Sequence, residues 1–143
     1  MPLKTLLTLS AAIYAGLITQ LIAAETLTVV ITNVPASEGT IMMQVMAGEA
    51  EFKGDMAPIA SVMQRAAAGE MSFTTTNLPP GDYALRVMHD VNNNGELDTN
   101  FVSMPTEPWA FSNNATGNFG PAKWADAKFT VAGETTQEIT LNK

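Results

Sequence analysis

Apolar and polar residues alternate along several short segments of the chain, with the period expected of a β-strand that buries one face. In the segment Thr26–Val34, Leu27, Val29 and Ile31 fall on one face and threonines fall on the other. The same alternation predicts further strands over residues 40–46, 71–78, 82–89, 127–132 and 136–141. Residues 57–69 are ambiguous and fit either a short helix or an irregular strand.

Turn-forming sequences separate these predicted strands. They are Pro-Ala-Ser-Glu-Gly at 35–39, Asn-Leu-Pro-Pro-Gly-Asp at 77–82, Asn-Asn-Asn-Gly at 92–95 and Ala-Gly-Glu at 132–134. Short strands at regular spacing with turns between them are typical of an antiparallel sandwich. The expected fold class is therefore all-β, an antiparallel immunoglobulin-like or transthyretin-like β-sandwich of about seven strands.

The first 24 residues have the composition of a secretory signal. Lys4 is the only charge before Glu25, residues 6–24 are apolar or small apart from a few polar residues, and Ala23-Ala24 offers a cleavage site. We predict a signal peptide over 1–24, one β-sandwich domain over 25–143 and a periplasmic or secreted location. The alternative is a membrane anchor, for which the segment is barely long enough, since a span needs about 20 apolar residues.

The charge and the lack of cysteine narrow the class of protein. The formal net charge is −7, and removal of Lys4 with the signal would make it −8. An acidic chain without a basic patch argues against nucleic acid as a partner and is compatible with cation binding. The sequence has no cysteine, so disulfides and thiolate metal sites are excluded. Stability then has to come from the core, with or without an ion.

One stretch, His-Asp-Val-Asn-Asn-Asn-Gly-Glu-Leu-Asp-Thr-Asn-Phe at 89–101, concentrates oxygen-bearing side chains directly after an apolar segment. From Asp90 onward it has the spacing of a calcium loop, with side-chain ligands at positions 1, 3 and 5, glycine at 6 and a carbonyl ligand at 7. Calcium takes about 6–8 oxygen ligands. The predicted metal ligands are Asp90, Asn92, Asn94, Glu96 through its carbonyl, and Asp98.

The loop departs from an EF-hand, and an ion-free turn is the alternative interpretation. Position 12, where an EF-hand has a bidentate glutamate, is Phe101, and no helical pattern flanks the loop. Its certain charges are Asp90 and Asp98, unless Glu107 joins from a distance. Two charges indicate weak affinity, with Kd of about 10⁻⁴–10⁻³ M. An Asn-Asn-Asn-Gly turn needs no ion, because Asn and Gly tolerate positive φ and Asp side chains make Asx-turns.

Residues 104–124 form a second unusual segment, which contains both tryptophans and has no charge between Glu107 and Lys123. A long loop without secondary structure is often functional. The candidate ligand-binding residues, for a carbohydrate or a peptide, are Trp109, Phe111, Asn113, Asn114 and Trp124. The alternative is that Trp109, Phe111, Phe119 and Trp124 plug one end of the sandwich, since aromatic clusters are more often core than site.

A family resemblance covers roughly residues 25–141 and is specific over 78–131. The matching motifs are Leu78–Tyr83, His89–Asn100, Pro105–Glu107, Phe111–Asn114, Phe119–Pro121 and Asp126–Phe129. In these the chain resembles the exported bacterial family named domain of unknown function 2141. The resemblance implies a secreted or periplasmic β-sandwich with no established activity. Ser103 stands where the family pattern has glycine, which leaves open whether a tight bend forms there.

The residues do not indicate an enzyme. His89 is the only histidine, no G-x-S-x-G motif is present, and alternation places His89 and Asp90 on opposite faces of a strand. We expect no catalytic residue, and a neutral His89 that donates a hydrogen bond to a loop carbonyl. The predicted function is an exported non-catalytic module of unknown role that binds a calcium-like ion, and the alternative is a recognition module. The partner is unknown, with an envelope glycan or protein as a candidate.

Binding of a soft metal ion is a further hypothesis. Copper favours thioether and imidazole ligands, of which the candidates are Met42, Met43, Met46, Met88 and His89. Met42 and Met43 point to opposite faces of a strand and so do not chelate together. Methionine as a filler of the core is the better default.

Overall fold

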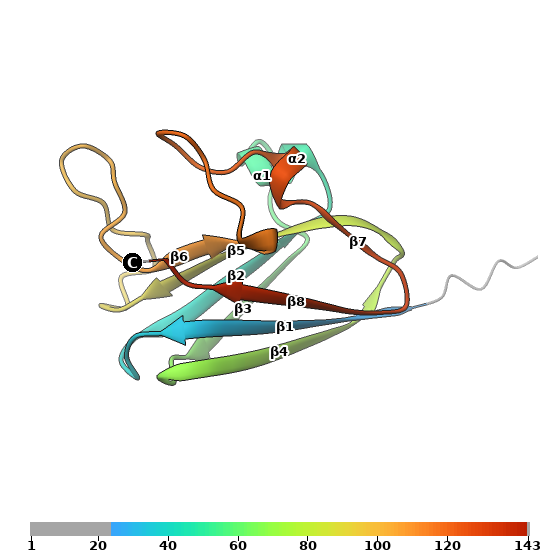
Figure 1. Cartoon of the computed structure of the whole chain (residues 1–143), viewed down its shortest axis with the longest axis horizontal. Helices are drawn as coiled ribbons and strands as arrows, with labels where there is room; N and C mark the ends of the chain where they lie inside the picture. The colour runs from blue at the N-terminus through green and yellow to red at the C-terminus, as the bar shows by residue number, and fades with distance from the viewer. Residues whose placement is uncertain (1–23, 143) are drawn as a thin grey trace, which may run out of the picture.

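The computed structural model describes residues 24–142, and strands dominate it (Figure 1). Its strands are β1 (Glu25–Val34), β2 (Thr40–Met46), β3 (Ala60–Arg65), β4 (Gly69–Leu78), β5 (Gly81–Asp90), β6 (Trp109–Phe111), β7 (Phe129–Val131) and β8 (Glu134–Thr140). Between them lie α1 (Glu49–Lys53), a 3₁₀ turn at Ser112–Asn114 and α2 (Trp124–Ala127). The predicted signal peptide lies outside the described residues except for Ala24.

The strands form two sheets that pack face to face. One sheet has the order β4-β1-β8, and the other has the order β3-β2-β5-β6 with β7 also paired to β5. All the strand pairs are antiparallel except β1 with β8, which is parallel. The all-β sandwich expected from the sequence is therefore confirmed, with one parallel pair that alternation alone does not reveal.

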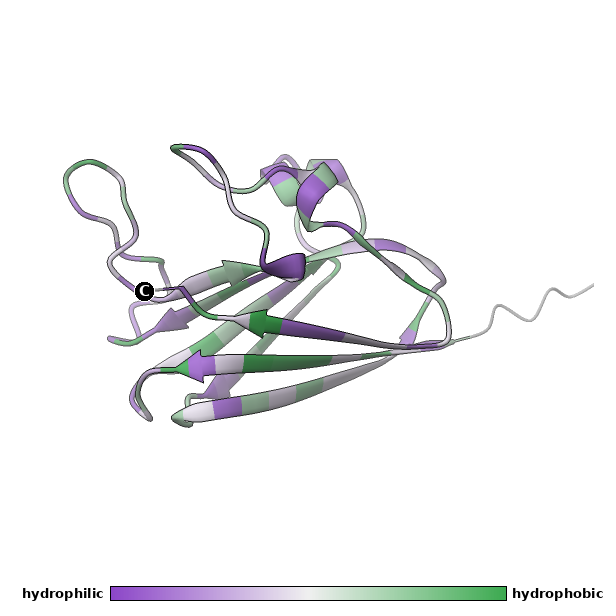
Figure 2. Cartoon of the chain, in the orientation of Figure 1, coloured by the Kyte–Doolittle hydropathy of each residue, from purple (hydrophilic) through white to green (hydrophobic). Residues whose placement is uncertain are grey.

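The core lies between the two sheets and follows from the alternation. Leu27, Val29 and Ile31 of β1 are completely buried, as are Ile41, Met43 and Val45 of β2. Figure 2 shows hydrophobic positions recurring along the strands of both sheets. Burying a side chain of this size contributes about 1.5–3 kcal/mol relative to leaving it exposed, so the interior-facing row of each strand is its main source of stability.

A smaller aromatic cluster lies where α1 and α2 come together beside β6. The Phe52 ring of α1 is 5.5 Å from the Phe111 ring and 5.9 Å from the Trp124 ring, measured between centroids. The α1 helix was not predicted, because its five residues are too few to show a helical period. Gly54 ends it in the left-handed region at φ 86°.

The structure assigns elements to the two segments, 57–69 and 104–124, for which the sequence predicts no clear secondary structure. Within the ambiguous segment 57–69, residues Ala60–Arg65 form the edge strand β3. The segment 104–124, for which no element was predicted, contains β6 and the 3₁₀ turn and ends at the start of α2. Trp109 and Asn142 join β6 to the C-terminal residues through two backbone hydrogen bonds of 3.1 and 2.9 Å. Neither helix of residues 24–142 is long and apolar enough to span a bilayer.

Candidate functional site

His89 and Asp90 are the last two residues of β5. His89 lies in the core, and Asp90 lies at the start of the loop. His89 is completely buried, and its Nε2 lies 2.6 Å from the carbonyl oxygen of Glu38. Because a carbonyl can only accept a hydrogen bond, Nε2 is the protonated nitrogen. The contact with a loop carbonyl is the one expected from the sequence, and it ties the turn at 35–39 to the end of β5.

The loop after β5 wraps around the Asp90 carboxylate, which is 2% exposed. Its Oδ1 accepts a hydrogen bond from the backbone N–H of Asn94 at 3.1 Å, and its Oδ2 accepts one from Gly95 at 2.8 Å. Asn93 and Gly95 take positive φ angles of 58° and 82° to make this possible. The turn geometry expected of Asn and Gly is therefore present.

Two asparagines link this wrapped loop to Asp98. The Oδ1 atoms of Asn92 and Asn94 accept hydrogen bonds from the backbone N–H two residues on, at 3.1 and 2.9 Å, which makes two consecutive Asx-turns. Their Nδ2 groups donate to the two carboxylate oxygens of Asp98, at 2.7 and 2.8 Å. Four of the five predicted metal-site residues, Asp90, Asn92, Asn94 and Asp98, thus share one hydrogen-bonded network, which also includes the backbone N–H of the fifth, Glu96.

Glu107 closes the loop. Its side chain is 7% exposed, its Oε1 accepts from Val91 N–H at 2.8 Å and its Oε2 accepts from Asp98 N–H at 3.0 Å. One carboxylate therefore holds both ends of the 91–98 loop. From the sequence, Glu107 is only a distant acid that contributes to the loop if the fold brings it close. Its position, 16 residues beyond Val91, gives no local signal of that contact.

The loop can supply oxygen ligands to a hard cation only with help from amides and carbonyls. Neither ion pair of residues 24–142 includes Asp90, Asp98 or Glu107. No group of three acidic or histidine side chains in that range has the geometry to hold a metal by itself. A calcium ion would therefore use the Asn oxygens and the Glu96 carbonyl as ligands. The Asp98 carboxylate would bind the ion in place of the hydrogen bonds that it accepts from the side-chain amides of Asn92 and Asn94. Phe101, at position 12, is 98% exposed and contributes no ligand.

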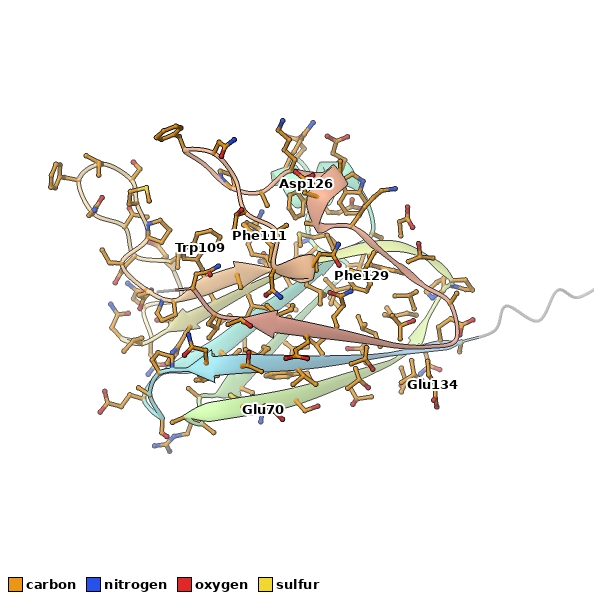
Figure 3. All side chains as sticks on the ribbon, viewed as in Figure 1. Glu70, Trp109, Phe111, Asp126, Phe129 and Glu134 are labelled. Atoms are coloured by element: carbon orange, nitrogen blue, oxygen red, sulfur yellow. The ribbon has the colours of Figure 1, made fainter. Side chains whose placement is uncertain are left out.

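The predicted ligand-binding residues lie in three places. Trp109 and Phe111 lie together on β6, with ring centroids 5.5 Å apart (Figure 3). Asn113 and Asn114 follow in the 3₁₀ turn, and both side-chain amides are engaged by backbone groups. Asn113 donates to the carbonyls of residues 126 and 128, while Asn114 accepts from the N–H of residue 140 at 2.8 Å. Trp124 is half-buried in the aromatic cluster beside Phe52.

A pocket of about 470 Å³ lies between residues 97–105 and residues 117–121, beside Trp109 and Phe111. Its lining is mostly apolar, and the side chains in it include Leu97, Met104 and Pro121. In Figure 1 the first segment is the loop at the left end of the molecule and the second is the loop that rises above β6, and Figure 2 shows hydrophobic positions on both. Trp109 and Phe111 also line a second groove, over the outer face of β2 and β5, so the predicted aromatic site borders two concave surfaces.

The alternative in which four aromatics plug the sandwich is wrong for one of them. Phe119 is fully exposed and has a positive φ of 57°, a conformation that is strained for a bulky side chain. Phe111 is buried, and Trp109 and Trp124 are half-buried. Three of the aromatics therefore pack as expected, and Phe119 lines the rim of the pocket instead.

The other rim of the pocket is a small hairpin. The Oδ1 of Asn100 accepts hydrogen bonds from the N–H groups of Val102 and Met104 at 3.0 and 3.1 Å. Ser103 adopts a left-handed φ of 61°. The tight bend therefore forms with serine in place of the glycine of the family pattern. Phe101 and Val102 at its tip are 98% and 59% exposed.

Comparison with known proteins gives one match. A family model described as "Uncharacterized protein conserved in bacteria (DUF2141)" matches residues 29–140. No curated protein and no solved structure matches the chain. The matched range contains the strands of both sheets except the first four residues of β1, together with the 90–98 loop and the two loops that border the pocket.

Proposed function

Because the chain belongs to this family of uncharacterized bacterial proteins, we propose its function from its own residues: it is an exported, non-catalytic β-sandwich module that holds a calcium-like ion in the Asp90–Asp98 loop. The ion is structural. It would reinforce a loop that Glu107 already joins to the segment leading into β6, through hydrogen bonds from the N–H groups of Val91 and Asp98.

The observation that carries this proposal is the set of acidic side chains around one tightly folded loop. The carboxylates of Asp90 and Glu107 are both buried, and neither has an ion-pair partner in residues 24–142. Burying a carboxylate is unfavourable unless hydrogen bonds or a cation compensate it. Backbone N–H groups compensate part of this cost, and each carboxylate oxygen keeps a lone pair that a calcium ion would use.

The experiment is a thermal melt of the purified protein with calcium, magnesium or chelator. Ligands this local are assembled only in the folded state, so ion binding raises Tm by mass action. With Kd near millimolar, the gain in stability is below about 1 kcal/mol at millimolar calcium. Magnesium should raise Tm less than calcium, because it demands octahedral geometry and dehydrates reluctantly.

Two variants make the test specific. Asp98→Asn removes one carboxylate of the loop and should abolish the calcium response. Glu70→Gln is the matched control, because it removes an exposed carboxylate from β4, on the sheet that does not carry the loop (Figure 3). A wild-type Tm that is indifferent to calcium and chelator would leave the loop as an ion-free Asx-turn network and end the proposal.

Export and the lack of catalysis are parts of the same proposal. The apolar segment that precedes Glu25 supports export, and mass spectrometry of protein from its native envelope should find an N-terminus near Glu25. An intact Met1 would favour the membrane anchor. The complete burial of His89 supports a non-catalytic role, since the single histidine does not reach solvent. A hydrolytic activity that His89→Ala abolished in a folded protein would contradict it.

A second candidate function is recognition of a carbohydrate or peptide, favoured by the apolar pocket beside Trp109. Pockets of a few hundred Å³ lined by aromatic and aliphatic side chains are typical of ligand sites. Glycan-array and peptide pull-down binding should be lost in Trp109→Ala. Binding should persist in Trp124→Ala, which alters the other tryptophan in the aromatic cluster. Equal binding by both variants would exclude the pocket as the recognition surface.

A further inference from the structure

Three methionines and a tryptophan form a row across the outer face of the larger sheet. The strand register pairs Met63 of β3 with Met42 of β2, Met42 with Met88 of β5, and Met88 with Trp109 of β6. Each residue therefore stands directly opposite its neighbour on four successive strands. Cβ atoms of such directly opposed residues are about 4.5–5.5 Å apart, so the row is continuous.

The row faces outward rather than into the core. Met43, the next residue along β2, is completely buried, and alternation therefore directs Met42 to the opposite face. Met42, Met88 and Trp109 are half-buried, and Met63 is 66% exposed. The solvent face of an antiparallel sheet is ordinarily polar, so three thioethers in register on that face call for an explanation other than core packing.

A groove of about 450 Å³ runs over this row. All four residues of the row line it, and the loop residues Gly95–Leu97 and Pro121 lie along its border. The groove partly shields the thioethers from water while leaving them open to a small solute. Methionine is unbranched with three rotatable bonds, so Met63 and Met88 can lean toward Met42 and bring their sulfur atoms together.

The donor set points to one class of ligand. Thioether sulfur is a soft, uncharged ligand that selects Cu(I) over hard cations, and a site of thioethers without imidazole or carboxylate disfavours Cu(II) and zinc. An indole face beside a cation adds an attractive contact. The geometry points to a soft-cation site in which Met42, Met63 and Met88 bind one Cu(I) or Ag(I) ion and Trp109 flanks it.

Two charged side chains, Arg86 and Glu96, line the groove. Arg86 stands in the next row, but its guanidinium is tied to the carbonyl of Phe52 at 2.8 Å and lies 5.9 Å from the centroids of the Phe52 and Phe111 rings. It is therefore anchored toward α1 rather than toward the methionines. Glu96 supplies one negative charge to the same lining, so the groove carries no net charge of its own. The acidic chain as a whole favours accumulation of cations.

This site shares no ligand with the calcium loop, although residues Gly95–Leu97 of that loop border the groove. It also differs from the hypothesis drawn from the sequence. Of the residues considered there, Met43 and His89 are buried on the inner face, and Met46 is on the outer face but buried in the aromatic cluster. Only Met42 and Met88 are partly exposed on the outer face and line the groove. Met63 was not among them, because the segment 57–69 gave no clear strand pattern. The register of β3 is what completes the set.

The test is a titration of the full chain with Ag(I), which is redox-inert, followed by Cu(I) competition against a chromophoric chelator under anaerobic reducing conditions. Tryptophan fluorescence should be quenched at one ion per chain. The quench should survive in Trp124→Phe and disappear in Trp109→Phe, in which binding itself persists. A stoichiometric ion that leaves Trp109 fluorescence unchanged would place binding elsewhere and overturn the proposal.

Leucine substitutions distinguish binding of a metal by sulfur from binding to an apolar surface. They keep the size and hydrophobicity of the groove and remove only the sulfur atoms. Since even indirect partners of a bound metal contribute roughly 10–100-fold in affinity, Met42→Leu should weaken binding by at least about tenfold. The triple variant at Met42, Met63 and Met88 should not bind. Met104→Leu, an exposed methionine outside the row, is the control and should bind as wild type.

Two results would overturn the site. One is equal Ag(I) affinity in wild type and in a triple-leucine variant whose circular dichroism is unchanged. The other, which needs no variant, is a wild-type protein that fails to compete for Cu(I) at all. If the triple variant does not fold, the Ag(I) affinity of the single variant Met63→Leu is the test, and an affinity equal to that of wild type would overturn the site. Met63 lies on the exposed edge strand, so its replacement leaves the core intact.

Discussion

Replacement of Glu107 by alanine should destabilise the protein strongly. The side chain is nearly buried and accepts two backbone hydrogen bonds, from Val91 at 2.8 Å and from Asp98 at 3.0 Å. A hydrogen bond to a charged acceptor contributes about 1.5–3 kcal/mol. Both donors are only part-buried and can be rehydrated in the variant, so we expect a loss of about 2–3 kcal/mol for the pair rather than the full sum.

Urea and thermal unfolding followed by circular dichroism measure this loss. For a domain of this size, 1 kcal/mol corresponds to about 4 °C, so Tm should fall by about 8–12 °C. Glu107→Gln keeps one oxygen acceptor and should lose roughly half as much. Glu70→Ala, at an exposed position of β4, should change stability by less than about 0.5 kcal/mol. If Glu107→Ala were as stable as Glu70→Ala, the clamp at the two ends of the loop would not exist in solution.

Three further predictions concern single contacts. Ser103→Gly should stabilise the protein by up to about 1 kcal/mol in urea unfolding, because serine is held at φ 61° where glycine is unstrained; a loss of stability would contradict the left-handed bend. Tyr83→Phe should cost about 1 kcal/mol in the same assay, since the buried hydroxyl donates to the Pro79 carbonyl at 2.7 Å; an unchanged midpoint would mean that water replaces this bond. The Lys128 ammonium and then the Thr130 hydroxyl lower the pKa of Asp82 below its ordinary 3.8. The contribution of Asp82 to stability is therefore present above that value and lost as pH falls through the folded-state pKa. Asp82→Asn should lower Tm at neutral pH, and the difference from wild type should vanish in strong acid; a difference that persisted there would refute this linkage.

The sequence predicts the parts of the fold in which the local pattern of residues determines whether each side chain is buried or exposed. Alternation along β5 places Val87 and His89 inward, and both are completely buried. The same pattern identifies β1 and β2, whose inward rows are the centre of the core. The Asx-turns of Asn92 and Asn94 were also predictable, because their partners lie two residues away in the chain.

The remaining parts depend on contacts between distant residues. Strand β6 has three residues and exists because β5 offers it an edge to pair with. Glu107 reaches the loop across 16 residues, and no local pattern marks that contact. The methionine row needs the register of three separate strand pairs at once. Alternation assigns a side chain to a face, but only pairing brings side chains of different strands together.

The parallel pairing of β1 with β8 also sets the order in which the molecule can be assembled. The hydroxyls of Thr32 and Thr140 bond at 3.0 Å across a separation of 108 residues. Contacts this far apart in sequence form late, because the loop between them has to close first. During synthesis, β1 therefore cannot pair with β8 until nearly the whole chain has been made. The sheet β4-β1-β8 is therefore incomplete until β8, the last strand of the described residues, has been synthesised.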